Sequence, residues 1–122
     1  MRILIAQGER DKLVTLGILI RSEGNEVQLV ERGAQVEAAV ETFRPDVVLL
    51  DLGMRDRSGL QVAVDLATAR GNTCPVLIAL SDNNSEMAKR LTAKAGFRHH
   101  VAKPYDPDAL LQLLASVGQK TS

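Results

Sequence analysis

Short apolar runs alternate along the chain with longer segments in which apolar residues recur every three or four positions. The runs have the length of buried strands, and the longer segments have the periodicity of helices with one apolar face. This alternation is typical of strand-helix repeats that form a parallel sheet. Strands are predicted at Ile3–Ala6, Glu26–Val30, Val47–Leu50, Val76–Leu80 and His99–Ala102.

Five helices are predicted between and after these strands. The apolar spacing is clearest in two sets, namely Val36, Ala39, Val40 and Phe43, and Leu110, Leu113, Leu114 and Val117. Helix-stopping residues follow the predicted helices at Gly24, Pro45, Gly71 and Gly96. A helix start is predicted at Asp106-Pro107. For the fourth helix the candidate caps are Asn83, Asn84 and Ser85. Glu86 stands three residues after Asn83, the spacing of a capping box. Residues 118–122 are expected to form a frayed tail.

Right-handed crossovers between successive strands predict a doubly wound α/β fold with helices on both faces of the sheet. In the flavodoxin-like strand order 2-1-3-4-5, the ligand crevice lies between the first and third strands. This order brings Gln7, Gly8 and Asp51 to one crevice, and it brings Ser81 and Lys103 to the same edge.

Length and composition predict one domain over residues 1–122 and exclude several function classes. Lys plus Arg and Asp plus Glu both number 15, so no basic excess exists to bind nucleic acid or an anionic membrane. Aromatic residues make up only 2%, which leaves little to stack on bases or a flavin. The single cysteine, Cys74, forms no internal disulfide and suits a reducing compartment, so a cytoplasmic location is expected.

Three chemically complementary residues stand at strand ends: a carboxylate (Asp51), a hydroxyl (Ser81) and an ammonium followed by proline (Lys103). Each one alone more often has a structural role, as a turn residue or a solvated cation. Their joint placement indicates a site where a phosphoryl group on the aspartate would find a cation and a hydroxyl donor.

Several short segments carry a resemblance that spans the chain: Asp51-Leu52-Gly53-Met54, Ser58-Gly59-Leu60, Leu80-Ser81, Ala95-Gly96 and Lys103-Pro104. The chain resembles the CheY-like receiver (phosphoacceptor) domain of two-component response regulators. The resemblance implies that Asp51 is the phosphoacceptor, Ser81 the switch hydroxyl and Lys103 the phosphate-pairing lysine. It also implies a cis Lys103-Pro104 peptide, and a histidine kinase or histidine phosphotransfer protein as the phosphoryl donor.

The chain departs from this family at the expected metal site. Receivers usually carry two acids after the first strand to hold Mg²⁺, and the matching residues here are Gln7 and Gly8. The ligands that remain are the Asp51 carboxylate and the backbone carbonyl of Gly53, so we expect Mg²⁺ to bind weakly. Glu9 follows and is interpreted as a surface acid.

Other departures affect the same pocket. Arg55 stands where receivers commonly have proline, and Asp82 follows Ser81 where a small residue is usual. Asp82 could repel a phosphoryl group or partly restore a metal site, whereas Arg55 or Arg10 could supply the positive charge of the metal. Each is more often a solvated loop residue. His100 stands where many receivers place the aromatic residue that reports the switch, and the face of the fourth helix, fifth strand and fifth helix is the family's usual output surface.

Two functions follow as hypotheses. The first is a phosphorelay receiver, and the alternative is a pseudo-receiver that binds its partner without phosphorylation. An enzyme is not expected, because a haloacid-dehalogenase-like phosphatase would need a second aspartate where Gly53 stands. The chain is interpreted as a stand-alone receiver or a piece of a longer regulator, and Met1 favours an N-terminal position.

Overall fold

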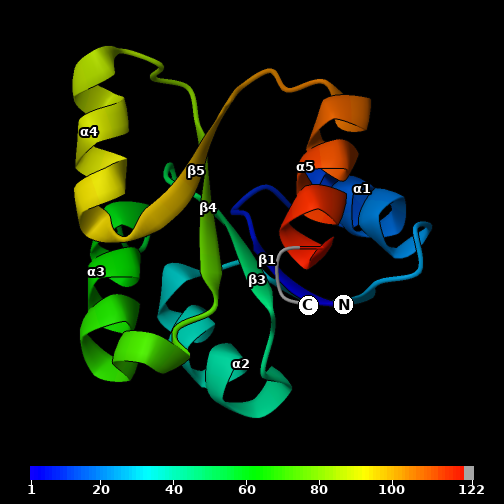
Figure 1. The fold of residues 1–122 in the computed structure, drawn as a ribbon, viewed down its shortest axis with the longest axis horizontal. Coiled ribbons are helices and arrows are strands. Elements are labelled where there is room, and N and C mark those ends of the chain that lie inside the picture. The colour runs from blue at the N-terminus through cyan, green and yellow to red at the C-terminus, as the bar shows by residue number, and fades with distance from the viewer. Residues whose placement is uncertain (120–122) are drawn as a thin grey trace.

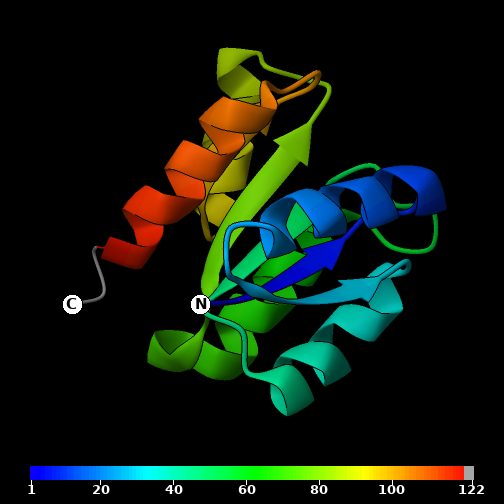
Figure 2. The same cartoon turned by 90° about the vertical axis from the view of Figure 1, so that its right-hand side faces the viewer.

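The computed structural model describes residues 1–119, in which five strands form one parallel sheet. The strands pair in the order β2-β1-β3-β4-β5, so the predicted topology is confirmed. In Figure 2 the visible strand arrowheads point toward the same end of the molecule. The strands are β1 (Arg2–Ala6), β2 (Glu26–Val30), β3 (Val47–Asp51), β4 (Val76–Ser81) and β5 (Phe97–Ala102).

Five α-helices cover the two faces of the sheet: α1 (Arg10–Arg21), α2 (Val36–Phe43), α3 (Gly59–Arg70), α4 (Glu86–Ala95) and α5 (Pro107–Gln119). Helices α1 and α5 cover one face, and α2, α3 and α4 cover the other (Figure 1). The two faces bury separate apolar clusters, as expected for a doubly wound sheet. None of the helices in this part of the chain is long and apolar enough to cross a bilayer.

The central strand β3 shows why the apolar run has no polar alternation. Val48 and Leu50 pack under α2 and α3, whereas Val47 and Leu49 pack under α1 and α5. Successive side chains of a strand point to opposite faces, and both faces are covered here. The run therefore remains apolar until it reaches the edge of the sheet at Asp51, which is itself buried.

Helix starts follow the cap chemistry of the sequence. Ser58 Oγ accepts a hydrogen bond from the Leu60 backbone N–H at the start of α3. Among the candidate caps for α4 the structure uses Ser85, whose Oγ accepts from the Ala88 N–H at 3.1 Å. Helix α5 begins at Pro107 after Asp106, as predicted.

Strands β1, β3 and β4 are each one residue longer than predicted, at Arg2, Asp51 and Ser81, and two other boundaries differ by two residues. Strand β5 begins at Phe97 rather than His99, because Phe97 is buried opposite Leu77 and the register with β4 shifts there. The tail expected at residues 118–122 starts too early, since α5 continues through Gly118 to Gln119. Residues 120–122 of that expectation lie outside the described residues.

Candidate functional site

The carboxyl ends of β1, β3, β4 and β5 place polar residues at one edge of the sheet. Gln7 follows β1, Asp51 ends β3, Ser81 ends β4 and Lys103 follows β5. Lys103 is attached to this edge by its backbone N–H, which donates to the Ser81 carbonyl at 2.9 Å, and the Lys103–Pro104 peptide is cis, as expected. Parallel pairing therefore brings together residues that lie far apart in sequence.

The Asp51 carboxylate is surrounded by hydrogen-bond donors. Its side chain is nearly inaccessible, since the residue is 2% exposed. The Oδ2 atom accepts from Lys103 Nζ at 2.5 Å and from Gln7 Nε2 at 2.6 Å. The Oδ1 atom accepts from the Gly53 backbone N–H at 2.7 Å. A buried carboxylate needs such partners, and Lys103 also compensates its charge.

Ser81 lies on the same edge, but its hydroxyl is bonded elsewhere. Ser81 Oγ accepts from the Asn83 N–H at 3.0 Å and donates to the Asn83 carbonyl at 3.1 Å. The hydroxyl is thus held by the loop between β4 and α4 and makes no hydrogen bond with Asp51. Asp51 and Lys103 are thus in contact as expected, whereas the Ser81 side chain would have to rotate to reach them.

His100 is linked to the same loop carbonyl. Its Nε2 atom lies 3.0 Å from the Asn83 carbonyl, and its Nδ1 atom lies 3.1 Å from Thr92 Oγ1 on α4. Thr92 is buried and its hydroxyl also reaches the Lys89 carbonyl at 3.0 Å. A continuous hydrogen-bonded path therefore connects Ser81 through Asn83 and His100 to α4.

A cavity of about 480 Å³ opens beside Asp51. It brings together acidic and basic side chains from four loops; its lining residues include Glu9, Glu31, Arg32, Arg55, Asp56 and Asp82. Asp82 is 87% exposed, and its carboxylate lies 4.0 Å from Lys103 Nζ. Of the two arginines considered from the sequence, Arg55 lines this cavity, whereas Arg10 pairs with Glu31 at 2.6 Å.

Asp56 is a residue that the sequence reasoning missed. Its two carboxylate oxygens accept from the backbone N–H groups of Gly33 and Ala34, at 2.9 and 3.0 Å. The Ala34 and Gly33 N–H groups hold the pKa of Asp56 below its usual value. This carboxylate therefore ties the loop after β3 to the short 3₁₀ turn Gly33–Gln35, which shapes the wall of the cavity.

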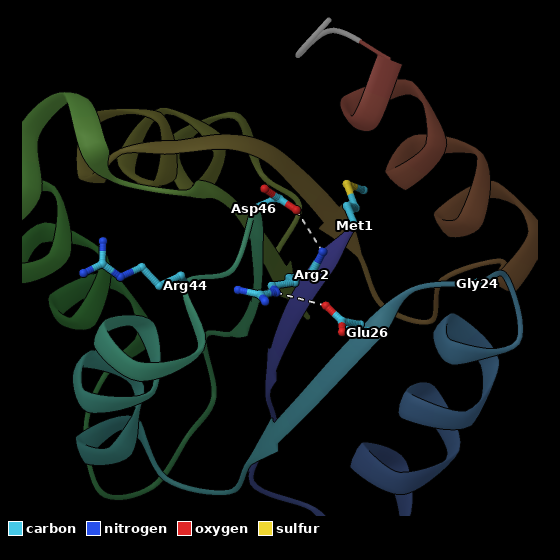
Figure 3. Close-up of a pocket in the computed structure, with 6 residues that line it drawn as sticks. All are labelled: Met1, Arg2, Gly24, Glu26, Arg44 and Asp46. Atoms are coloured by element: carbon cyan, nitrogen blue, oxygen red, sulfur yellow. Dashed lines mark hydrogen bonds and ion pairs between the residues drawn. The ribbon is translucent and has the colours of Figure 1, made fainter.

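A second cavity lies at the opposite end of the sheet and shows no comparable chemistry (Figure 3). Arg2 Nε pairs with Glu26 at 2.9 Å, and the Arg2 N–H donates to Asp46 at 2.8 Å. Two of its acids are thus already bonded to Arg2, and none of its lining residues comes from the edge that carries Asp51. The Asp51 edge is the better candidate for a functional site.

Comparison with known proteins decides the family. The family model of the response regulator receiver domain matches residues 3–115. The chain belongs to the receiver family. This receiver is 29% identical over 117 residues to the protein PilH of Pseudomonas aeruginosa, covering 95% of this chain and 96% of PilH. It is 27% identical over 121 residues to the cell cycle transcriptional regulator CtrA of Caulobacter vibrioides, covering 99% of this chain.

The receiver is 31% identical over 110 residues to the DNA-binding response regulator MtrA of Mycolicibacterium smegmatis, covering 90% of this chain. It spans only about half the length of these relatives, namely 52% of CtrA and 47% of MtrA. Among solved structures, the Francisella response regulator 1452 receiver domain has a TM-score of 0.91 at 21% identity and covers 99% of this chain and 98% of its own. A Clostridium difficile two-component response regulator has a TM-score of 0.92 at 14% identity, covering 100% and 98%. These structures support the fold.

Receiver domains are generally signalling modules rather than enzymes, and they typically bind Mg²⁺ at an acidic pocket. The residues of this receiver do not fit that ion. Among residues 1–119, no group of three or more His, Cys, Asp or Glu side chains could hold a metal. Gln7 presents Nε2, a donor, to Asp51, and Gly8 has no side chain. The neutral replacements expected from the sequence thus leave Asp51 and the Gly53 carbonyl without a third ligand.

Asn83 and Thr92 are further residues whose role the sequence reasoning missed. The sequence predicts Asn83 only as a candidate helix cap, whereas in the structure its backbone joins Ser81 to His100. A signal for Thr92 was present, because a hydroxyl three positions before Ala95 falls on the buried face of α4. A polar side chain on such a face needs a partner, which here is His100.

Proposed function

We propose that this receiver accepts a phosphoryl group on Asp51 from a phosphohistidine of a histidine kinase or histidine phosphotransfer protein. The observation that carries the proposal is the Asp51 carboxylate, which ends β3 beside an open cavity and is in contact with Lys103 at 2.5 Å. The ammonium group compensates the aspartate now, and it is also placed to compensate the oxygens of a phosphoryl group.

The transfer balances with groups that this chain and its donor supply. An oxygen of Asp51 attacks the phosphorus, and the new O–P bond forms as the P–N bond of the phosphohistidine breaks. The electron pair of the broken bond leaves with the imidazole nitrogen, which takes a proton from water. Lys103 and the Gly53 N–H remain beside Asp51, where they are close to the charged phosphoryl oxygens and orient the acyl phosphate.

The path from Ser81 to α4 supports a switch. When the Ser81 hydroxyl turns to a phosphoryl oxygen, its hydrogen bond to the Asn83 carbonyl breaks. That carbonyl then keeps only its hydrogen bond with His100. The loop and the His100–Thr92 contact then repack, and the change reaches the surface of α4. Met87 and Leu91, which are 64% and 48% exposed, lie one turn apart on that helix. We propose that the face of α4, β5 and α5 carries the output.

Intact-mass measurement tests the proposal. Purified chain is treated with a small phosphodonor, and separately with a phosphorylated kinase or phosphotransfer protein. The expected product is heavier by one phosphoryl group and is lost in Asp51→Asn, while the matched variant Asp108→Asn, on the first turn of α5, still forms it. An adduct that persists in Asp51→Asn would refute the assignment of the acceptor.

One observation favours a second function, a constitutive interaction module. Asp51 already receives three hydrogen bonds in this state, one of them from Gln7 in the place of an expected acid. In such a pseudo-receiver the face of α4, β5 and α5 binds its partner without phosphorylation. The absence of an adduct with every donor, together with partner binding that is equal for the wild type and Asp51→Asn, would favour this function.

A further inference from the structure

The orientation of the Gln7 side chain is fixed by its own loop. Its Oε1 atom accepts the Glu9 backbone N–H at 3.1 Å, and an amide nitrogen could not accept this bond. The other end of the amide, Nε2, therefore faces Asp51, where it donates at 2.6 Å. The hydrogen bonds at both ends of the Gln7 amide require the same orientation, in which the donor Nε2 faces Asp51 and the carbonyl oxygen faces the Glu9 backbone.

A cation at Asp51 would have to displace this amide. Asp51 Oδ2 is shared by Gln7 and Lys103, and Oδ1 is taken by the Gly53 N–H. Gln7 is only 7% exposed, so a displaced Nε2 would lose its partner in a place where little water can replace it. The amide therefore opposes metal binding in addition to providing no ligand.

The cavity has four other acids. Glu31 pairs with Arg10, and both oxygens of Asp56 accept backbone N–H groups. Glu9 pairs with Lys12 at 3.4 Å, and Asp82, whose side chain is 87% exposed, lies 4.0 Å from Lys103 Nζ. The cavity also has positive charge without a metal, since Arg32, Arg55 and Lys103 line it. Phosphoryl oxygens that enter there meet an ammonium, a guanidinium and an amide donor, all supplied by the chain.

We propose that this receiver works without a divalent cation, with Gln7 as the positioning residue that holds Asp51 and with Lys103 and Arg55 supplying the positive charge. The proposal deepens the phosphoacceptor site and rests on the proposed function for its second test. Its first test is independent of phosphorylation, because it measures only the binding of the metal.

The first test is a Mg²⁺ titration followed by the backbone amide NMR signals of the wild type and of the double variant Gln7→Asp, Gly8→Asp. For the wild type we expect no saturable shifts at Asp51 and Gly53 at millimolar Mg²⁺. The double variant supplies two carboxylates and is expected to bind Mg²⁺ more tightly, by about tenfold or more. Saturable wild-type shifts that disappear in Asp51→Asn would overturn the proposal.

The second test measures adduct formation with a small phosphodonor in EDTA and in Mg²⁺. Equal yields in the wild type, a lower yield in Gln7→Ala and an unchanged yield in the exposed matched control Gln112→Ala are expected. The double variant should regain dependence on Mg²⁺, a change that a merely structural role of Gln7 would not produce. An adduct that forms only with Mg²⁺ overturns this inference while leaving the proposed function intact. No adduct in either condition refutes the proposed function, and the titration then decides the inference by itself.

Discussion

Gly59 packs directly against the backbone of Asp51 and Leu52 at the end of β3. It is the first residue of α3, directly after the cap Ser58. A Cβ atom added there would lie 2.8 Å from Leu52 Cα and 2.9 Å from the Asp51 carbonyl oxygen. Both are backbone atoms of the segment that carries the acceptor, so they cannot rotate away. In Gly59→Ala either α3 or the end of β3 must therefore move.

The size of the effect follows from two opposing contributions. Overpacking in a closely packed region costs about 1–3 kcal/mol. Alanine is a better helix former than glycine by at most about 1 kcal/mol, and less in the first turn. We expect Gly59→Ala to lower the free energy of unfolding by about 1–2 kcal/mol, which corresponds to a fall of about 4–8 °C in Tm for a domain of this size.

Urea unfolding followed by circular dichroism measures this change, with the slope of the transition compared between variants. Gly8→Ala is the matched control, because its Cβ would meet only the Glu31 carbonyl oxygen, at 4.0 Å. Its stability should remain within about 0.5 kcal/mol of the wild type. If Gly59→Ala were as stable as Gly8→Ala, the close approach of α3 to the end of β3 would not limit the packing there.

Three further predictions concern the core, the cysteine and the switch path. Leu66→Ala should cost about 2–5 kcal/mol in urea unfolding because Leu66 is fully buried, while Leu91→Ala on the exposed side of α4 should change stability by less than about 0.5 kcal/mol. Burial raises the pKa of the Cys74 thiol, so alkylation of the folded chain should reach its half-maximal rate at a higher pH than alkylation of the urea-unfolded chain. A carbonyl only accepts hydrogen bonds, so neutral His100 should carry its proton on Nε2 toward Asn83, which imidazole ¹⁵N shifts report.

Each of these predictions has a contradicting result. A Leu66→Ala variant with the stability of Leu91→Ala would mean that the Leu66 side chain does not pack in the core. A Cys74 rate profile with the same midpoint in the folded and unfolded chain would show that the thiol is solvated. A neutral His100 with its proton on Nδ1 would break the path that joins Ser81 to α4.

The sequence predicted the strand order and the edge that holds the site because these depend on patterns that span many residues. Five apolar runs and the spacing between them allow few right-handed arrangements. Boundaries were harder where one residue carries the signal. Phe97 is followed by Arg98 and two histidines, so no apolar run marks the start of β5 in the sequence. In the structure the strand begins at Phe97 because the register between β4 and β5 shifts near Leu77.

The placement of the site followed from the sequence, whereas its hydrogen-bond partners did not. Residues at the carboxyl ends of parallel strands must lie near one edge, so Asp51 and Lys103 meet as the topology requires. The direction of the Ser81 hydroxyl depends on the loop of Asn83, whose conformation no periodic pattern encodes. The amide of Gln7 likewise takes its orientation from the Glu9 backbone, a contact between neighbours that composition cannot indicate.

Site mapping of the phosphorylated chain identifies the residue that accepts the phosphoryl group, which we propose is Asp51. Borohydride reduces an acyl phosphate of aspartate to homoserine, which tandem mass spectrometry locates in the digested chain. We predict homoserine at position 51 in the wild type after treatment with a phosphodonor, and none in Lys103→Ala under the same brief exposure, because that variant lacks the ammonium beside Asp51. Homoserine at any other aspartate position, with Asp51 unmodified, would show that Asp51 is not the acceptor.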